Sequence, residues 1–119
     1  MTESAPHPRL SIRVELAPGV RIGPGKVLLL EEIARGGSIS AAGRKLRMSY
    51  RRAWELVEDL NRGLGTTVVV TAAGGAGGGG ARLTEAGQAV VREYRKLEAA
   101  SGAAAAPHLA ALRRVAGVG

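Results

Sequence analysis

Residues 38–64, SISAAGRKLRMSYRRAWELVEDLNRGL, contain two helical patterns separated by Arg47 and Met48. Ser38 and Ser49 stand where each pattern begins, and a serine hydroxyl there can accept a hydrogen bond from a free amide of the first turn. In the second pattern, apolar residues recur at helical spacing, so one side of that helix is expected to be buried. The stretch predicts a helix-turn-helix.

The second helix begins with Tyr50, Arg51 and Arg52. A recognition helix lies in the major groove of DNA and contacts base edges with its N-terminal residues. Cations at a helix N-terminus are unfavourable against the helix dipole by about 0.3–1 kcal/mol each. An isolated pair of arginines is more often a solvated helix end, but the serine caps, the small residues of the preceding helix and the net charge favour DNA contact.

Composition narrows the function classes. The chain has 119 residues, which suits one domain, and 17 Lys and Arg against 10 Asp and Glu give a net charge of +7. This charge favours a polyanionic partner, and nucleic acid is the first choice. With no cysteine, and with His7 and His108 both in terminal segments, we expect no disulfide and no metal site. No apolar run approaches the ~20 residues of a membrane span, and no signal sequence opens the chain, so we expect a cytoplasmic protein.

The residues before the helix-turn-helix predict a small strand pair and a helix. Residues 1–9 are expected to form a disordered tail. Ser11–Leu16 alternates like a half-buried strand, and Val20–Ile22 adds a second short strand after a Pro-Gly turn. The helix at Gly25–Arg35 has apolar residues around much of its circumference, which suggests one face for the core and another for a dimer.

The residues after it predict a β-hairpin wing. Strands are expected at Thr66–Thr71 and Ala81–Leu83, joined by a loop with six glycines between Gly74 and Gly80. Glycine lets backbone amides approach a phosphate closely, and Arg82 supplies charge at the base of the loop. A nucleotide-binding loop is the alternative, but the Walker form needs Gly-Lys followed by Ser or Thr, and that sequence is absent.

The last predicted helix begins after Thr84, which caps it. Ala86, Val90, Tyr94 and Leu97 form one stripe, which we expect to pack on the core and to help form the dimer. From Ser101 the pattern is lost, although residues 108–115 could form a short helical turn. The domain is therefore expected to span residues 10–100, followed by a partly mobile tail at 101–119.

Taken together, the SISAA segment, the SYRRAW run and the GGGGARLTEAG segment resemble the N-terminal DNA-binding domain of ModE, the molybdate-responsive regulator, which is related to LysR-type regulators. The resemblance implies a winged-helix dimer that binds a pseudo-palindromic operator and controls molybdenum-related genes. ModE binds molybdate in separate C-terminal modules, and a chain that ends at Gly119 has no room for them, so no effector site is expected here. Arg47 stands where such turns often have glycine, and a left-handed conformation there would cost ~1–2 kcal/mol.

The predicted fold is mainly α with a small β wing, a winged helix-turn-helix. The predicted function is a sequence-specific DNA-binding regulator that acts as a homodimer on double-stranded DNA, without cofactor or effector. A nonspecific or architectural nucleic-acid-binding protein is the alternative. No constellation of residues supports an enzyme. The predicted DNA-binding residues are Ser38, Arg44, Lys45, Ser49, Tyr50, Arg51, Arg52 and Arg82.

Overall fold

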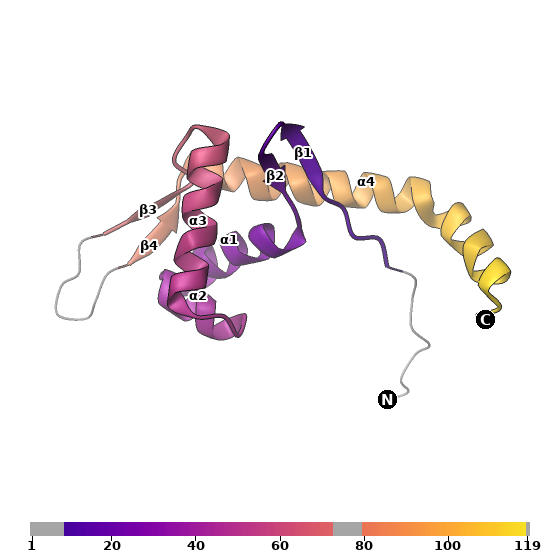
Figure 1. Cartoon of the computed structure of the whole chain (residues 1–119), viewed down its shortest axis with the longest axis horizontal. Helices are drawn as coiled ribbons and strands as arrows, with labels where there is room; N and C mark the ends of the chain where they lie inside the picture. The colour runs from indigo at the N-terminus through magenta and orange to yellow at the C-terminus, as the bar shows by residue number, and fades with distance from the viewer. Residues whose placement is uncertain (1–8, 73–79, 119) are drawn as a thin grey trace.

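The computed structural model describes residues 9–72 and 80–118 (Figure 1). Its elements, in chain order, are β1 (Val14–Ala17), β2 (Val20–Ile22), α1 (Pro24–Gly36), α2 (Ile39–Lys45), α3 (Tyr50–Leu64), β3 (Val69–Thr71), β4 (Ala81–Leu83) and α4 (Glu85–Ala116). The predicted class, mainly α with a small β wing, is confirmed. The expected disordered tail, apart from Arg9, and the glycine loop, apart from Gly80, lie outside the described residues.

Serine caps fix the start of both helices of the helix-turn-helix. The Ser38 hydroxyl accepts a hydrogen bond from the Ala41 amide at 2.9 Å, and the Ser49 hydroxyl accepts one from the Arg52 amide at 3.0 Å. Each bond satisfies an amide that has no partner within its own helix. The predicted caps, and with them the start of the recognition helix, are confirmed.

The turn between α2 and α3 is tight. Arg47 has a φ of 60°, so the turn keeps the left-handed conformation despite the cost that the sequence indicated for a residue other than glycine. A Cβ placed on Gly43 would lie 3.2 Å from the Met48 carbonyl oxygen and 3.6 Å from the Ala53 Cβ. The small residue at position 43 therefore allows the two helices to cross closely.

Helix α1 lies at the centre of the core. Val27, Leu29, Leu30 and Ile33 are fully buried, because α1 packs against α2, α3, α4 and β4. Its own domain covers these four residues, so the apolar surface that α1 leaves exposed is small and its large residue is Leu28, at 41% exposed. A dimer contact through α1 stays a prediction.

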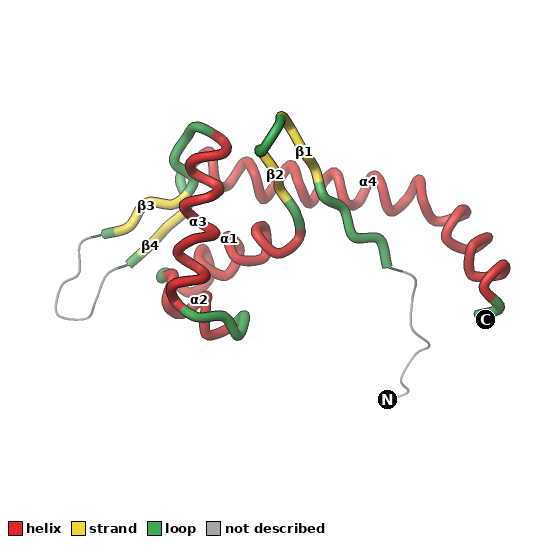
Figure 2. The backbone as a smooth tube through the Cα atoms, viewed as in Figure 1, coloured by secondary structure: helices red, strands yellow, loops and turns green. Residues whose placement is uncertain are grey.

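Two separate antiparallel hairpins flank the helices (Figure 2). Strand β3 pairs with β4 in the predicted wing, with Val70 opposite Arg82. The Ala81 amide donates to the Gly37 carbonyl at 2.8 Å, which ties the wing to the start of the helix-turn-helix. In the other hairpin, β1 is less buried than its alternation predicts, since Leu16 is 60% exposed.

Helix α4 is the longest element and makes the molecule elongated. Its 32 residues correspond to about 48 Å of helix, and the chain measures 56 × 39 × 21 Å. The expected loss of pattern after Ala100 does not end the helix, which continues to Ala116. Alanine has the highest helix propensity, so the run at Ala103–Ala106 stays helical without an amphipathic pattern, and Pro107 is accommodated within the helix.

Candidate nucleic-acid interface

Helix α2 and the N-terminal half of α3 lie together on the side of the molecule away from α4, and the wing extends beside them (Figure 1). The predicted DNA-binding residues come from these elements and from the loops that begin α2 and α3. The fold therefore brings their backbones to one end of the molecule, where α1 packs against α2, α3 and β4.

The first turn of α3 carries the most exposed cations. The Arg51 side chain is 88% exposed, and its Nε lies 3.4 Å from Glu55 Oε2. Arg52 is exposed and has no ion-pair partner within residues 9–72 and 80–118. The middle of α3 carries the carboxylates of Glu55, Glu58 and Asp59, and its last turn carries the exposed Arg62, which pairs with Asp59 at 3.3 Å. A polyanion is thus attracted to the N-terminal end of α3 and repelled further along it.

Helix α2 and the turn add more positive charge. The Arg44 guanidinium donates to Ser40 Oγ at 2.9 Å, which holds its side chain along α2. Lys45 and Arg47 are exposed, and neither forms an ion pair with another described residue. Arg47 was noted in the sequence only for its backbone conformation. Its exposure next to α3 adds it to a basic cluster that we define as Arg44, Lys45, Arg47, Arg51 and Arg52.

Three predicted site residues have different environments. The oxygens of Ser38 and Ser49 accept capping hydrogen bonds, so each can still donate its hydroxyl proton to a phosphate. Ser38 is half-buried and Ser49 is exposed, which makes Ser49 the more accessible donor. Arg82 is exposed on β4, between the buried Ala81 and Leu83. Their contacts with DNA stay predictions.

Trp54 is a candidate that the sequence analysis did not select. Its side chain is 44% exposed, and that of Tyr50, four residues earlier, is 57% exposed. Residues four apart lie on the same side of a helix, so Tyr50 and Trp54 share one side of α3. The signal in the sequence was that Trp54 falls outside the apolar stripe of Ala53, Val57 and Leu60.

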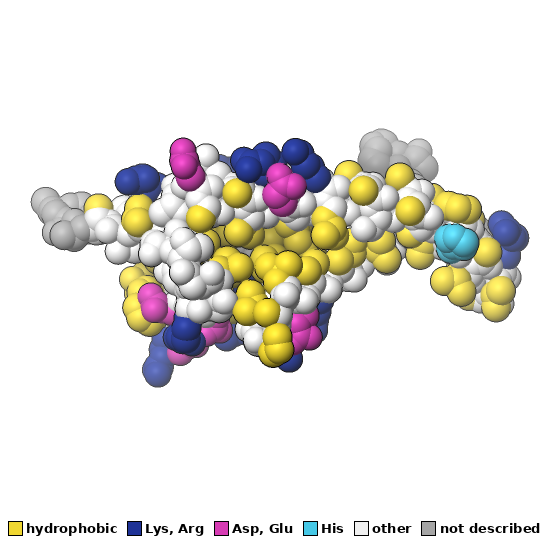
Figure 3. Space-filling model, turned by 90° about the horizontal axis from the view of Figure 1, so that it is seen from above, with side chains coloured by type: hydrophobic (Ala, Val, Ile, Leu, Met, Phe, Trp, Pro, Cys, Tyr) yellow, Lys and Arg dark blue, Asp and Glu magenta, His cyan; other side chains and the backbone are white. Residues whose placement is uncertain are grey.

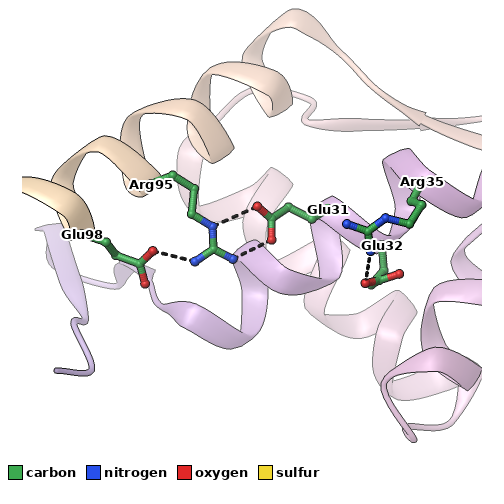
Figure 4. A network of polar contacts seen from close by, with 5 residues as sticks. All are labelled: Glu31, Glu32, Arg35, Arg95 and Glu98. Carbon is green, nitrogen blue, oxygen red and sulfur yellow. Dashed lines mark hydrogen bonds and ion pairs between the residues drawn. The ribbon is translucent and has the colours of Figure 1, made fainter. Parts of the chain in front are cut away.

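A partly buried ion network joins α4 to α1 (Figure 4). Arg95 Nε and Nη2 donate to the two oxygens of Glu31 at 2.9 and 2.5 Å, and Nη1 donates to Glu98 at 2.6 Å. The hydrogen bonds from Arg95 lower the pKa of Glu31, against a smaller opposing effect of burial. The hydrogen bonds that Arg95 donates to Glu31, followed by the one that it donates to Glu98, raise the pKa of Arg95. This bidentate contact sets the position of α4 relative to the core.

Neither a metal centre nor a membrane span is found in the described part of the chain. Within residues 9–72 and 80–118, no three His, Cys, Asp or Glu side chains gather in a way that could hold a metal ion. None of the helices in these ranges combines the length and the apolar character needed to cross a membrane.

The chain is similar in sequence to known proteins that contain a helix-turn-helix. The model of the family described as "Bacterial regulatory helix-turn-helix protein, lysR family" matches residues 26–88. The chain is 47% identical over 81 residues to the molybdenum-pterin-binding protein MopB of Rhodobacter capsulatus, an alignment that covers 68% of this chain and 30% of MopB. It is 33% identical over 90 residues to the molybdenum transport protein ModE of Azotobacter vinelandii, covering 76% of this chain and 33% of ModE.

A solved structure shows the same fold. The DNA-binding domain of CbnR, in a crystal structure with DNA, superposes with a TM-score of 0.59 at 22% identity, covering 75% of this chain and 97% of that domain. The fold and the helix-turn-helix define a winged-helix domain of the kind found in DNA-binding regulators. The chain belongs to the lysR family of bacterial regulatory helix-turn-helix proteins. It spans about a third of the length of the MopB and ModE relatives.

Proposed function

We propose that this chain reads DNA for a sequence-specific transcription regulator of the ModE type. The observation that carries the proposal is the charge distribution of α3, whose first turn exposes Arg51 and Arg52 while its middle turns carry the carboxylates of Glu55, Glu58 and Asp59. Phosphates on both walls of the groove would repel Glu55, Glu58 and Asp59. Helix α3 is therefore expected to enter the major groove with its N-terminal end first, in one orientation.

A fixed orientation favours sequence-specific over nonspecific binding. In the major groove a guanidinium can donate two hydrogen bonds to a guanine, and the Ser49 cap and the tight turn hold the start of α3 rigidly. Arg44, Lys45, Arg47 and Arg82 would contact phosphates and set the register without reading bases. An architectural protein that binds DNA nonspecifically would need the positive charge but not a rigidly held start of α3. We propose no catalytic role for any of these residues.

The names of the relatives connect the proposed regulator with molybdenum. MopB is named for binding molybdenum-pterin and ModE for molybdenum transport, and we propose that the target genes are molybdenum-related and that the protein acts in the cytoplasm. We expect no molybdate site in this chain, because a tetrahedral oxyanion needs convergent amides and cations held rigidly, whereas the side chains of the basic cluster are exposed. Calorimetry at near-physiological salt should show no stoichiometric molybdate binding to this chain; micromolar binding would overturn this point.

A homodimer is the proposed assembly, and it rests on an apolar groove between the β1–β2 hairpin and α4. The groove has a volume of about 300 Å³ and is lined by Val14, Leu16, Ile22, Leu64, Ala89, Val90, Glu93, Tyr94 and Leu97. Figure 3 shows hydrophobic side chains gathered on this face and along α4. A two-fold contact through it would cover this surface on both copies and present two recognition helices to one DNA site.

Binding selection followed by substitution tests the function. A preferred duplex is first selected from random-sequence DNA. Arg51→Ala and Arg52→Ala are each expected to weaken binding to it by ~1–3 kcal/mol if the wild-type side chains contact bases, with folding intact because both are exposed. Arg92→Ala, on the exposed face of α4, removes the same charge away from the proposed interface and serves as the control. Wild-type affinity and discrimination against random DNA in the Arg51/Arg52 double variant would overturn the proposal.

A further inference from the structure

The exposed aromatic side chains of this protein all lie at the start of α3. The chain has two tyrosines, one tryptophan and no phenylalanine. Tyr94 is buried, and its hydroxyl donates to the Ile12 carbonyl at 2.6 Å. Tyr50 and Trp54 are the other two, at 57% and 44% exposed. Tryptophan is usually well buried, so this exposure is informative. We call Tyr50 and Trp54 the aromatic edge.

The aromatic edge lies on one flank of the DNA-facing helix end. With about 100° between successive residues of an α-helix, Arg51 and Glu55 point away from the core. Tyr50 and Trp54 lie on one side of that pair, and Arg52 lies on the other. The N-terminal half of α3 therefore presents charge along its centre and two adjacent rings along one border. The charged side chains and the aromatic rings would therefore enter the same groove.

The major groove offers few partners for an exposed ring. Base edges there carry hydrogen-bond donors and acceptors, except for the 5-methyl group of thymine, which apolar side chains contact. Resting on the proposed function, we propose that Trp54, with Tyr50 beside it, recognises the methyl group of a thymine next to the bases that the arginines contact. The aromatic edge would then specify a position of the DNA site that charge alone cannot specify.

The alternative explanation for two exposed aromatic rings is a docking site for another protein. The charge beside Tyr50 favours DNA: Tyr50 stands in the first turn with Arg51 and Arg52, and the basic cluster continues through Arg47 into α2. Trp54 is followed by Glu55, whose carboxylate is paired with Arg51 at 3.4 Å. A polyanion that approached these cations would cover the rings as well.

Fluorescence provides the first test, because Trp54 is the sole tryptophan of the chain. Acrylamide, a neutral quencher, reports how accessible the indole is. In the full chain mixed with the selected duplex, quenching of Trp54 should fall clearly below that of the free protein. If the protein binds the duplex and quenching stays unchanged, Trp54 lies outside the interface and the inference is overturned.

Removal of single methyl groups provides the second test. Each thymine of the selected duplex is replaced in turn by deoxyuridine, which lacks only the 5-methyl group. At one position, wild-type affinity should fall about fourfold, the factor that burial of one methyl-sized group gives. In Trp54→Ala this penalty should disappear, while in Trp54→Phe it should persist. Leu28→Ala, which trims an exposed apolar residue on α1, should keep the full penalty.

The outcomes separate the inference from the proposed function. If no selected duplex binds, the proposed function fails. If a duplex binds and Trp54→Ala shows the same deoxyuridine penalties as wild type, the inference alone fails. If Trp54→Ala does not fold, Trp54→Gln takes its place, and the quenching of the unmodified chain still decides. Protection of Trp54 by an added protein but not by the duplex would identify a protein-docking surface and overturn the inference.

Discussion

Helices α3 and α4 are both amphipathic in sequence, but the domain covers their apolar sides to different extents. In α3, Ala53, Val57 and Leu60 are each at most 3% exposed. In α4, Gly87 and Tyr94 are the buried residues, whereas Leu97, Leu112 and Val115 are 38%, 62% and 85% exposed. The outer face of α3 is polar and is proposed to contact DNA, while α4 retains apolar surface that its own chain does not cover. An amphipathic pattern shared by two helices therefore does not specify a shared partner.

A substitution near the N-terminal end of α4 should have the largest effect on the stability of the fold. A Cβ on Gly87 would lie 2.2 Å from the Val68 carbonyl oxygen, a contact that requires the backbone to move. We expect Gly87→Ala to lower the free energy of unfolding by about 2–3 kcal/mol, the upper part of the range for overpacked sites. Urea unfolding at one fixed protein concentration measures the change.

Gly102, in the same helix, provides a control for which the opposite change in the free energy of unfolding is expected. A Cβ on Gly102 would meet no atom within 4 Å, so Gly102→Ala should raise the free energy of unfolding by up to about 1 kcal/mol through helix propensity alone. Similar effects of the two substitutions would show that α4 is not anchored through Gly87, and the contrast between its two ends would no longer hold.

The apolar groove of α4 gives the next prediction. Leu97→Glu places a charge where the proposed dimer buries an apolar side chain, and the loss should weaken association by about 2 kcal/mol. Light scattering at tens of micromolar should show a wild-type dimer and a variant shifted toward monomer. Leu28→Glu tests separately whether the exposed residue of α1 takes part in the contact. A wild-type monomer at these concentrations would contradict the proposed dimer.

Local signals were predicted well because their causes are local. The caps at Ser38, Ser49 and Thr84 depend on residues one turn apart, and the structure confirms each of them. The left-handed conformation of Arg47 was noted as costly, and the structure adopts it nonetheless. The basic first turn of α3 could likewise be predicted, since the apolar stripe already determines which side of the helix is exposed.

The remaining features depend on contacts between distant segments. Periodicity showed that α1 is apolar all round, but not that four other elements surround it. It showed alternation in β1, but not that Leu16 would stay exposed. The helix beyond Ala100 was missed because periodicity detects amphipathic helices, whereas an alanine-rich segment is helical by propensity. Trp54 was overlooked because a tryptophan near an apolar stripe is usually a core residue.

The smallest expected effect concerns the ion network that joins α4 to α1. Glu31→Gln removes the carboxylate that accepts two hydrogen bonds from Arg95. We expect the free energy of unfolding at neutral pH to fall by about 0.5–1 kcal/mol, because the Arg95 side chain is still 39% exposed and solvent screens the pair. Asp59→Asn, which removes an exposed carboxylate paired with Arg62 within α3 at 3.3 Å, is the control and should change stability less.

The pH dependence identifies the origin of this effect. The pKa of Glu31 is lowered in the folded state, chiefly by its hydrogen bonds with Arg95. A depressed carboxyl pKa contributes stability that is fully present above the unfolded-state pKa and is lost as the pH falls through the folded-state value. The difference between wild type and Glu31→Gln should therefore be constant near neutral pH and shrink in acid, below the ordinary range of glutamate. If urea unfolding gave the same difference at neutral and strongly acidic pH, the contribution of Glu31 would come from packing, and α4 would be held to the core without the ion network.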